Sequence, residues 1–172
     1  MLQVLGAFMI VLGGIGFGYC YSEEERKKIA FVEKWEYIMY IFSSEIIYKK
    51  QPLSLACKEI GEKTGGKEGE FLKNVSARMQ KRRKEGFDSI WQEECIGYFS
   101  REKIPAEEEI LIREFGILTG FEDENIQKKM IEEQAGKWKK LRLQKQEEYQ
   151  ERKRLVMILS SCIGIMIVLI LW

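Results

Sequence analysis

Residues 31–46 read FVEKWEYIMYIFSSEI, and this stretch decides the fold of the chain. Five apolar side chains recur in it at intervals of four, three, four and four residues: Phe31, Trp35, Ile38, Phe42 and Ile46. An α-helix turns once about every 3.6 residues, so this spacing places all five on one face, which Val32 and Met39 widen. The stretch is therefore predicted to be an amphipathic helix that ends before Gln51-Pro52 and packs against other helices.

Further helices are predicted downstream, because several segments keep this helical spacing and none alternates with a period of two residues. Pro52 suits the first turn of a second helix, with Leu53 on its apolar face. Thr64-Gly65-Gly66 ends that helix. The third helix finishes before Gly86 and carries an apolar face formed by Phe71, Leu72, Val75 and Met79.

The remaining three helices are predicted from their start and stop signals. Ser89 and Gln92 resemble a capping box that opens the fourth helix. Pro105 opens the fifth, acidic residues in its first turn favour a helix N-terminus, and Gly120 closes it. The sixth begins at Asp123 or a neighbour and becomes polar on all sides in its later part, which predicts an exposed stalk. Together these segments predict an all-α fold, a six-helix antiparallel bundle.

All charged residues lie between two apolar ends. The 28 lysines and arginines and the 27 aspartates and glutamates fall between Glu23 and Arg154. At about 1.5 Å per residue, residues 1–22 and 155–172 are each long enough to cross a hydrocarbon core of about 30 Å. We therefore expect an N-terminal transmembrane helix (1–22), a cytoplasmic helical bundle with a C-terminal stalk (23–154) and a C-terminal transmembrane helix (155–172).

The orientation in the membrane is predicted from basic residues beside the two spans. Arg26-Lys27-Lys28 follow the first span, and Arg152-Lys153-Arg154 precede the second. Lysine and arginine accumulate on the cytoplasmic side of membrane helices. The middle domain is thus expected in the cytoplasm, with both termini on the far side of the membrane.

Gly14 and Gly18 form a GxxxG spacing inside the first span. This spacing lets two membrane helices approach closely, so it predicts packing against the second span or against a partner. The alternative is that small residues are simply common in membrane helices.

Composition argues against several kinds of active site. The net charge is +1, which gives no electrostatic reason to expect nucleic-acid binding, and histidine is absent. The four cysteines are far apart, at positions 20, 57, 95 and 162, and no CxxC pair exists. No catalytic residue, cofactor or metal site is therefore predicted. Residues 61–67 match GxxxxGK, but Glu68 stands where a Mg²⁺-binding Ser or Thr is needed, so the stretch is interpreted as a glycine-rich turn.

A basic cluster is expected at the end of the third helix, formed by Lys81, Arg82, Arg83 and Lys84. It is either a solvated helix end that complements the macrodipole or a contact to anionic lipid or an acidic partner. For partner docking, the sequence favours the end of the bundle far from the membrane, where the turns at Gly65-Gly66, Gly86 and Gly120 are expected to lie.

Glu45 falls on the core-facing side of the first helix, three residues after Phe42 and seven after Ile38. A buried carboxylate requires partners, so it is expected to accept hydrogen bonds from a helix N-terminus or from a Lys or Arg and thereby fix the turn at Pro52. The alternative is a carboxylate at the edge that reaches water.

The chain resembles the stage III sporulation protein AB family of endospore-forming bacteria over its whole length. The residues that carry the resemblance are the opening Met1-Leu2-x-x-Leu5-Gly6, the string Glu45-Ile46-x-Tyr48-x-x-x-Pro52-Leu53-x-x-Ala56, Trp91, and the string Phe115-Gly116-x-x-x-Gly120-x-x-Asp123-x-x-x-Gln127. Thr119 and Phe121-Glu122 depart from the family pattern, which expects leucine before Gly120 and Ile/Leu-Ser before Asp123.

The resemblance implies a domain like those of the type II secretion protein F, a platform that meets a cytosolic ATPase. It implies a non-catalytic adaptor in the channel between mother cell and forespore, with the domain on the mother-cell side. The expected partners are a secretion-type ATPase, similar to stage III sporulation protein AA, and other membrane components of the channel. Glu45, Pro52, Leu53, Trp91, Gly116, Gly120, Asp123 and Gln127 are the candidate structural or interaction residues.

Two other function classes stay open. A homo-oligomeric membrane pore or helical sensor would assemble through the glycine-rich span and the stalk. An enzyme at the membrane surface would use acidic pairs or Cys57 and Cys95, although no motif groups them.

Overall fold

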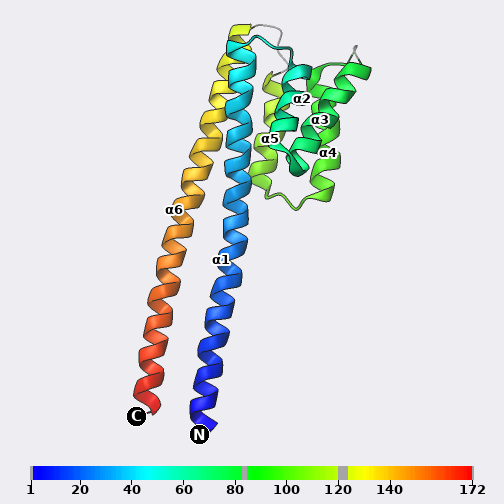
Figure 1. Cartoon of the computed structure of the whole chain (residues 1–172). Coiled ribbons are helices and arrows are strands. Elements are labelled where there is room, and N and C mark those ends of the chain that lie inside the picture. The colour runs from blue at the N-terminus through cyan, green and yellow to red at the C-terminus, as the bar shows by residue number, and fades with distance from the viewer. Residues whose placement is uncertain (1, 83–84, 120–123, 172) are drawn as a thin grey trace. The chain divides into compact units, whose positions relative to one another are not determined.

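The computed structural model describes residues 2–82, 85–119 and 124–171, and within these ranges it contains helices and no strand (Figure 1). In chain order the elements are α1 (Leu2–Ser43), the π-helix η1 (Ser44–Tyr48), α2 (Leu53–Thr64), α3 (Gly66–Lys81), α4 (Phe87–Arg101), α5 (Ala106–Thr119) and α6 (Glu124–Leu171). The predicted all-α class with six helices is confirmed.

The chain divides into two compact units. One is Val32–Leu141, called here the helical bundle, and the other comprises residues 1–31 and 142–172. The division falls inside α1 and α6, because each of these helices runs unbroken from one unit into the other. The predicted boundaries at residues 22 and 154 stay predictions. Among the described residues, no helix has both the length and the apolar character needed to span a membrane.

Within the bundle, α2–α3, α3–α4 and α4–α5 pack as consecutive antiparallel pairs beside the last part of α1 (Figure 1). This up-and-down order brings η1, the start of α2, the α3–α4 connection and the start of α6 to one end, called here the η1 end. The α2–α3 turn and the α4–α5 loop lie at the other end, where Lys67 pairs with Glu102 at 2.6 Å. The sequence analysis predicted that the turns at Gly65-Gly66 and Gly86 lie at the same end of the bundle. This prediction was wrong, because the full length of α3 separates them.

The core of the bundle is aromatic, and the stripe predicted in residues 31–46 lies at its centre. Trp35, Phe42, Trp91, Phe115 and Trp138 are all fully buried. Trp35 of α1 stacks on Trp138 of α6, with 5.7 Å between ring centroids and 16° between ring planes. Phe42 packs on Phe115 with centroids 4.9 Å apart. Each such side chain contributes about 1.5–3 kcal/mol when fully buried, so this stripe ties α1 to α4, α5 and α6.

The stretch that imitates a nucleotide-binding loop is a turn between α2 and α3, as the sequence predicted. Gly65 and Gly66 have φ of 59° and 63°, a left-handed conformation that glycine adopts without a steric penalty. Lys34 of α1 donates to the Gly65 carbonyl at 3.3 Å and pairs with Glu68, which stands where a phosphate loop needs Ser or Thr.

One prediction of a helix start was wrong. The helix α4 begins at Phe87 with Gly86 as its N-cap, so Ser89 lies inside the helix and caps nothing. Gln92 does not reach back to Ser89, because its amide instead donates to the Arg113 carbonyl of α5 at 2.8 Å. The Gln92 side chain, which the local pattern assigned to a helix cap, therefore makes a tertiary hydrogen bond instead.

The helices α2 and α3 touch backbone to backbone. A Cβ placed on Gly69 would lie 2.5 Å from the carbonyl oxygen of Gly61, and one on Gly61 would lie 2.7 Å from the carbonyl oxygen of Gly69. Backbone atoms of two packed helices cannot move aside as a flexible side chain would, so both positions require glycine.

We expect Gly69→Ala to lower the free energy of unfolding by about 1–3 kcal/mol, because the added methyl group overpacks the α2–α3 contact. Gly97→Ala is the matched control, since a Cβ there meets nothing within 4 Å. The control should be neutral or stabilise by up to about 1 kcal/mol through helix propensity. Urea unfolding of the full chain in detergent micelles, followed by tryptophan fluorescence, measures both; equal stability of Gly69→Ala and wild type would contradict the contact.

Candidate functional site

The residues singled out from the sequence fall into two groups within the bundle. Glu45, Pro52, Leu53 and Gln127 lie at the η1 end, whereas Trp91 and Gly116 lie in the core between α4 and α5. Gly120 and Asp123 lie outside the described residues. Pro52 and Gln127 of the first group line a groove, and the second group packs α4 against α5.

The chain leaves α1 through an unusual backbone segment. The helix widens into the π-helix η1, where the Lys49 amide donates to the Ser44 carbonyl. Lys50 then takes a positive φ of 51°, which residues other than glycine rarely adopt. The Gln51 amide donates to the Glu45 carbonyl at 3.1 Å, and Pro52 caps α2. Single π-turns occur often at functional sites, so this segment is a candidate for one.

Glu45 joins η1 to α2 through its carboxylate. The residue is 2% exposed. Its Oε1 accepts hydrogen bonds from Lys49 Nζ at 2.9 Å and from Lys63 Nζ, on the last turn of α2, at 3.0 Å. The hydrogen bond from Lys49, followed by that from Lys63, holds the pKa of the Glu45 carboxyl below its usual value of 4.5. Burial and a lysine partner are what the sequence predicted for this residue.

Trp91 and Gly116 form a packing contact between α4 and α5. The Trp91 indole Nε1 donates to the Ile112 carbonyl at 2.7 Å, and its ring lies directly on Gly116. A Cβ on Gly116 would overlap ring atoms of Trp91. These two positions therefore hold the fold and offer no surface to a partner.

Gln127 ties the first turn of α6 to the end of α5. Its amide nitrogen donates to the Thr119 carbonyl at 2.9 Å. Thr119 departs from the leucine of the family pattern, yet it is fully buried, and its hydroxyl donates to the Phe115 carbonyl at 2.6 Å. The departure is accommodated because the hydroxyl finds a partner inside its own helix.

A groove of about 370 Å³ opens at the η1 end. Residues from η1, the connection from η1 to α2 and the first two turns of α6 line it: Ile46, Ile47, Lys50, Gln51, Pro52, Asn125, Gln127 and Lys128. Ile46 and Pro52 belong to the sequence string that suggested a site here. Ile47, Lys50 and Lys128 were missed, because no local pattern brings residues on α1 and α6 together.

The basic cluster is partly neutralised within the bundle. Arg82 pairs with Glu85 at 3.0 Å and with Glu93 at 3.5 Å, and Glu85 raises its pKa by hydrogen bonding. Lys81 is exposed. Arg83 and Lys84 lie outside the described residues. The ion pairs of Arg82 favour the interpretation as a solvated helix end.

Side chains able to act as nucleophiles are shielded in the bundle. Cys57 and Cys95 are buried free thiols. Burial raises the pKa of Cys57 and raises that of Cys95 to about 12, so both stay protonated at neutral pH. Among the described residues, no group of Cys, Asp and Glu is placed to hold a metal ion.

Gly14 and Gly18 lie in α1. Their surroundings fall outside what the structure describes, so the GxxxG packing stays a prediction.

Comparison with known proteins points to one family. The sequence model for Stage III sporulation protein AB matches residues 3–172. A solved structure of Stage III sporulation protein AB is similar to this chain, with a TM-score of 0.65 and 14% sequence identity over 72% of this chain and 97% of that one. At this identity the structural likeness concerns the fold alone. A search of curated proteins finds no match.

We expect Glu45→Gln to lower the free energy of unfolding by about 1–3 kcal/mol at neutral pH, because two charge-assisted hydrogen bonds are lost. The pKa of Glu45 is lowered in the folded state, so its stabilisation is present above the unfolded value of 4.5 and is lost as the pH falls through the folded value. The difference between variant and wild type should therefore shrink in acid.

Urea unfolding of the full chain in detergent micelles across this pH range measures the difference. Glu62→Gln, an exposed position on α2, is the control and should stay within about 0.5 kcal/mol of wild type. A Glu45→Gln deficit that is the same at every pH would show that the ion pairs do not cause it.

Proposed function

Because this chain belongs to the stage III sporulation protein AB family, we propose that it is a non-catalytic platform of a secretion-like sporulation channel. In this proposal two transmembrane helices anchor it in the mother-cell-derived membrane, with the helical bundle on the mother-cell side of the channel to the forespore. The bundle docks a cytosolic secretion-type ATPase and contacts other membrane components of the channel. The observation that carries the proposal is the continuity of α6, which runs as one helix from the bundle into the apolar C-terminal segment.

The exposure of that segment supports a membrane anchor. Residues 155–159, all apolar, are between 46% and 60% exposed. Successive residues point about 100° apart around a helix, so five in a row leave no polar side. Burying apolar surface is favourable by about 25 cal/mol per Å². A helix that is apolar on all sides gains this free energy in lipid but not in water.

The polar chemistry of the bundle supports a non-catalytic role. Glu45 and Glu68 are held by lysines, and the phenol of Tyr98 donates to Glu68 at 3.4 Å. Burial raises the pKa of Tyr98 as it does for the two thiols. These groups stabilise contacts between helices. The proposed role of the bundle is therefore to bind a partner through its surface.

The orientation of the anchors follows from charge. Basic residues flank both apolar ends on the bundle side, which supports an orientation with the bundle in the cytoplasm and both termini across the membrane. The docking of a secretion-type ATPase rests on the resemblance to type II secretion protein F and is a fold-level analogy.

Topology is tested by proteolysis in vegetative cells that express the full chain in the plasma membrane and from which the wall has been removed, because added protease reaches only the outer face of that membrane. Trypsin added outside should leave residues 23–154 intact, because they are rich in lysine and arginine but lie in the cytoplasm. After the membrane is permeabilised, the exposed stalk at residues 144–154 should be cut. Cleavage of residues 23–154 before permeabilisation would show that the bundle lies outside the cytoplasm and would contradict the proposal.

Docking is tested by binding of the full chain in lipid nanodiscs to the secretion-type ATPase of the same cells. We expect saturable binding by interferometry that empty nanodiscs do not show. Absence of binding by a chain whose helicity and melting transition are intact would exclude the platform role with this partner.

A further inference from the structure

The groove at the η1 end has the form of a binding site for a short peptide segment. Its volume of about 370 Å³ falls within the range of specific pockets. Ile46, Ile47 and Pro52 supply apolar surface, and the amides of Gln51, Asn125 and Gln127 supply polar contacts. The lining therefore combines apolar surface with several polar and charged groups, which suits a peptide segment that carries both kinds of side chain.

The walls of the groove are held in place before any partner arrives. The backbone amide of Gln51 donates to the Glu45 carbonyl, and the side-chain amide of Gln127 donates to the Thr119 carbonyl. The ring of Pro52 fixes its φ angle. Glu45 is itself clamped by Lys49 and Lys63. A preformed wall loses little conformational entropy on binding, so contacts made here translate into affinity.

The charge of the groove selects its occupant. Both charged side chains among the described residues that line it are lysines, Lys50 on one wall and Lys128 on the other. Lys128 also faces Glu132 at 4.0 Å, but both side chains are more than half exposed, so this ion pair is weak and leaves the ammonium group accessible. Carboxylates placed between the two lysines would be attracted from both sides.

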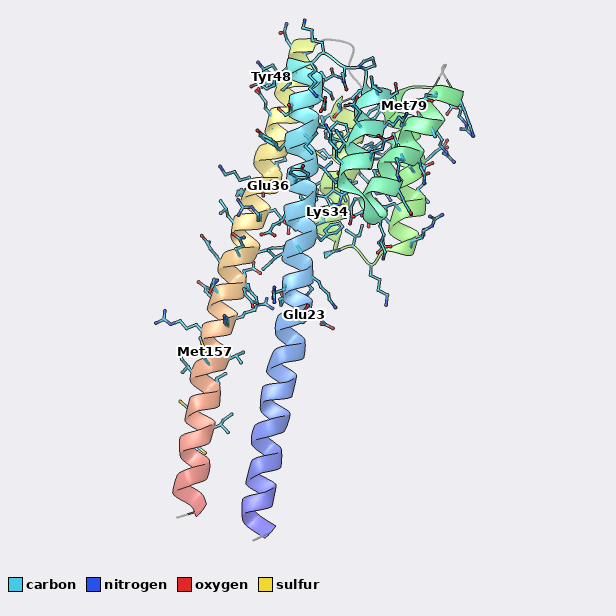
Figure 2. All side chains as sticks on the ribbon, viewed as in Figure 1. Glu23, Lys34, Glu36, Tyr48, Met79 and Met157 are labelled. Atoms are coloured by element: carbon cyan, nitrogen blue, oxygen red, sulfur yellow. The ribbon has the colours of Figure 1, made fainter. Side chains whose placement is uncertain are left out.

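Two exposed apolar side chains neighbour the groove residues along the chain. Tyr48, labelled in Figure 2, directly follows the groove residue Ile47 and is 82% exposed. Ile126 lies between the groove residues Asn125 and Gln127 and is 44% exposed. Tyrosine is enriched among the residues that carry most of the binding energy in protein interfaces. The occupant therefore needs an apolar side chain as well as acidic ones.

We propose that the groove at the η1 end binds an acidic peptide segment of the cytosolic partner, with carboxylates on Lys50 and Lys128 and an apolar side chain against Ile47 and Pro52. This inference rests on the proposed function, since it assigns the surface through which the platform meets its partner.

Charge reversal tests the proposal with full-length chain in nanodiscs and the secretion-type ATPase as the probe. Lys128→Glu should raise Kd about tenfold or more, and so should Lys50→Glu. The control is Lys103→Glu, which changes the net charge equally but lies in the α4–α5 loop at the other end of the bundle. Its Kd should stay within about twofold of wild type. Raising the salt concentration should weaken wild-type binding more than binding by Lys128→Glu.

The unusual backbone at Lys50 makes a folding defect conceivable for that variant, so each variant is first checked by its thermal transition. Lys128 lies on a regular helix and carries the test if Lys50→Glu does not fold. Wild-type binding with equal affinity in folded Lys128→Glu would overturn the groove assignment while leaving the platform role standing.

A second arm does not depend on the ATPase. A photo-crosslinking amino acid placed at Tyr48 in sporulating cells should capture an acidic segment of a cytosolic protein, identified by mass spectrometry. The same group at Ile96, which is 60% exposed on α4, should not capture that segment. If the acidic segment is captured but the ATPase does not bind, the groove assignment would be supported and the ATPase would be excluded as the partner. Capture of a second copy of this chain, of lipid, or of a segment lacking acidic residues would overturn the inference.

Discussion

The stacking of Trp35 on Trp138 is the contact on which the rest of the bundle depends. It joins the first helix of the bundle to the last, which are separated by four other helices along the chain. Because α1 runs toward the η1 end and α6 runs away from it, this pairing brings Val32 and Leu141 to the same end of the bundle. The chain thus enters and leaves the bundle at one end, and η1 lies at the other end.

The polar contacts of the bundle determine where the helices end. Lys34 and Glu68 join α1 to the start of α3, and Glu45 with Lys63 joins η1 to the last turn of α2. A buried carboxylate without a partner would cost several kcal/mol, so each pair restricts the possible position of its helix. The close approach of Gly61 and Gly69 adds a steric restriction of the same kind.

The family resemblance and the structure assign different roles to residues that the sequence presents together. Trp91 and Gly116 act within the core, where the indole lies on the glycine, and Gln127 acts as a tie between α5 and α6. Pro52 lines an accessible groove. A sequence string therefore mixes positions retained for packing with positions available to a partner, and only burial separates the two.

Much of the architecture follows from the sequence alone. The spacing of Trp35, Ile38 and Phe42 determines a helix with one buried face, because periodicity is a local property of the chain. The glycine-rich turn near Gly65 and the burial of Glu45 follow in the same way. The start of α4 does not, because Gln92 bonds to α5 rather than to its own helix. Nor does the groove, since Lys50 and Lys128 meet only after α1 and α6 have packed. Local spacing determines which faces are buried, but tertiary packing alone decides which distant residues become neighbours, because that choice depends on contacts between helices that no local pattern encodes.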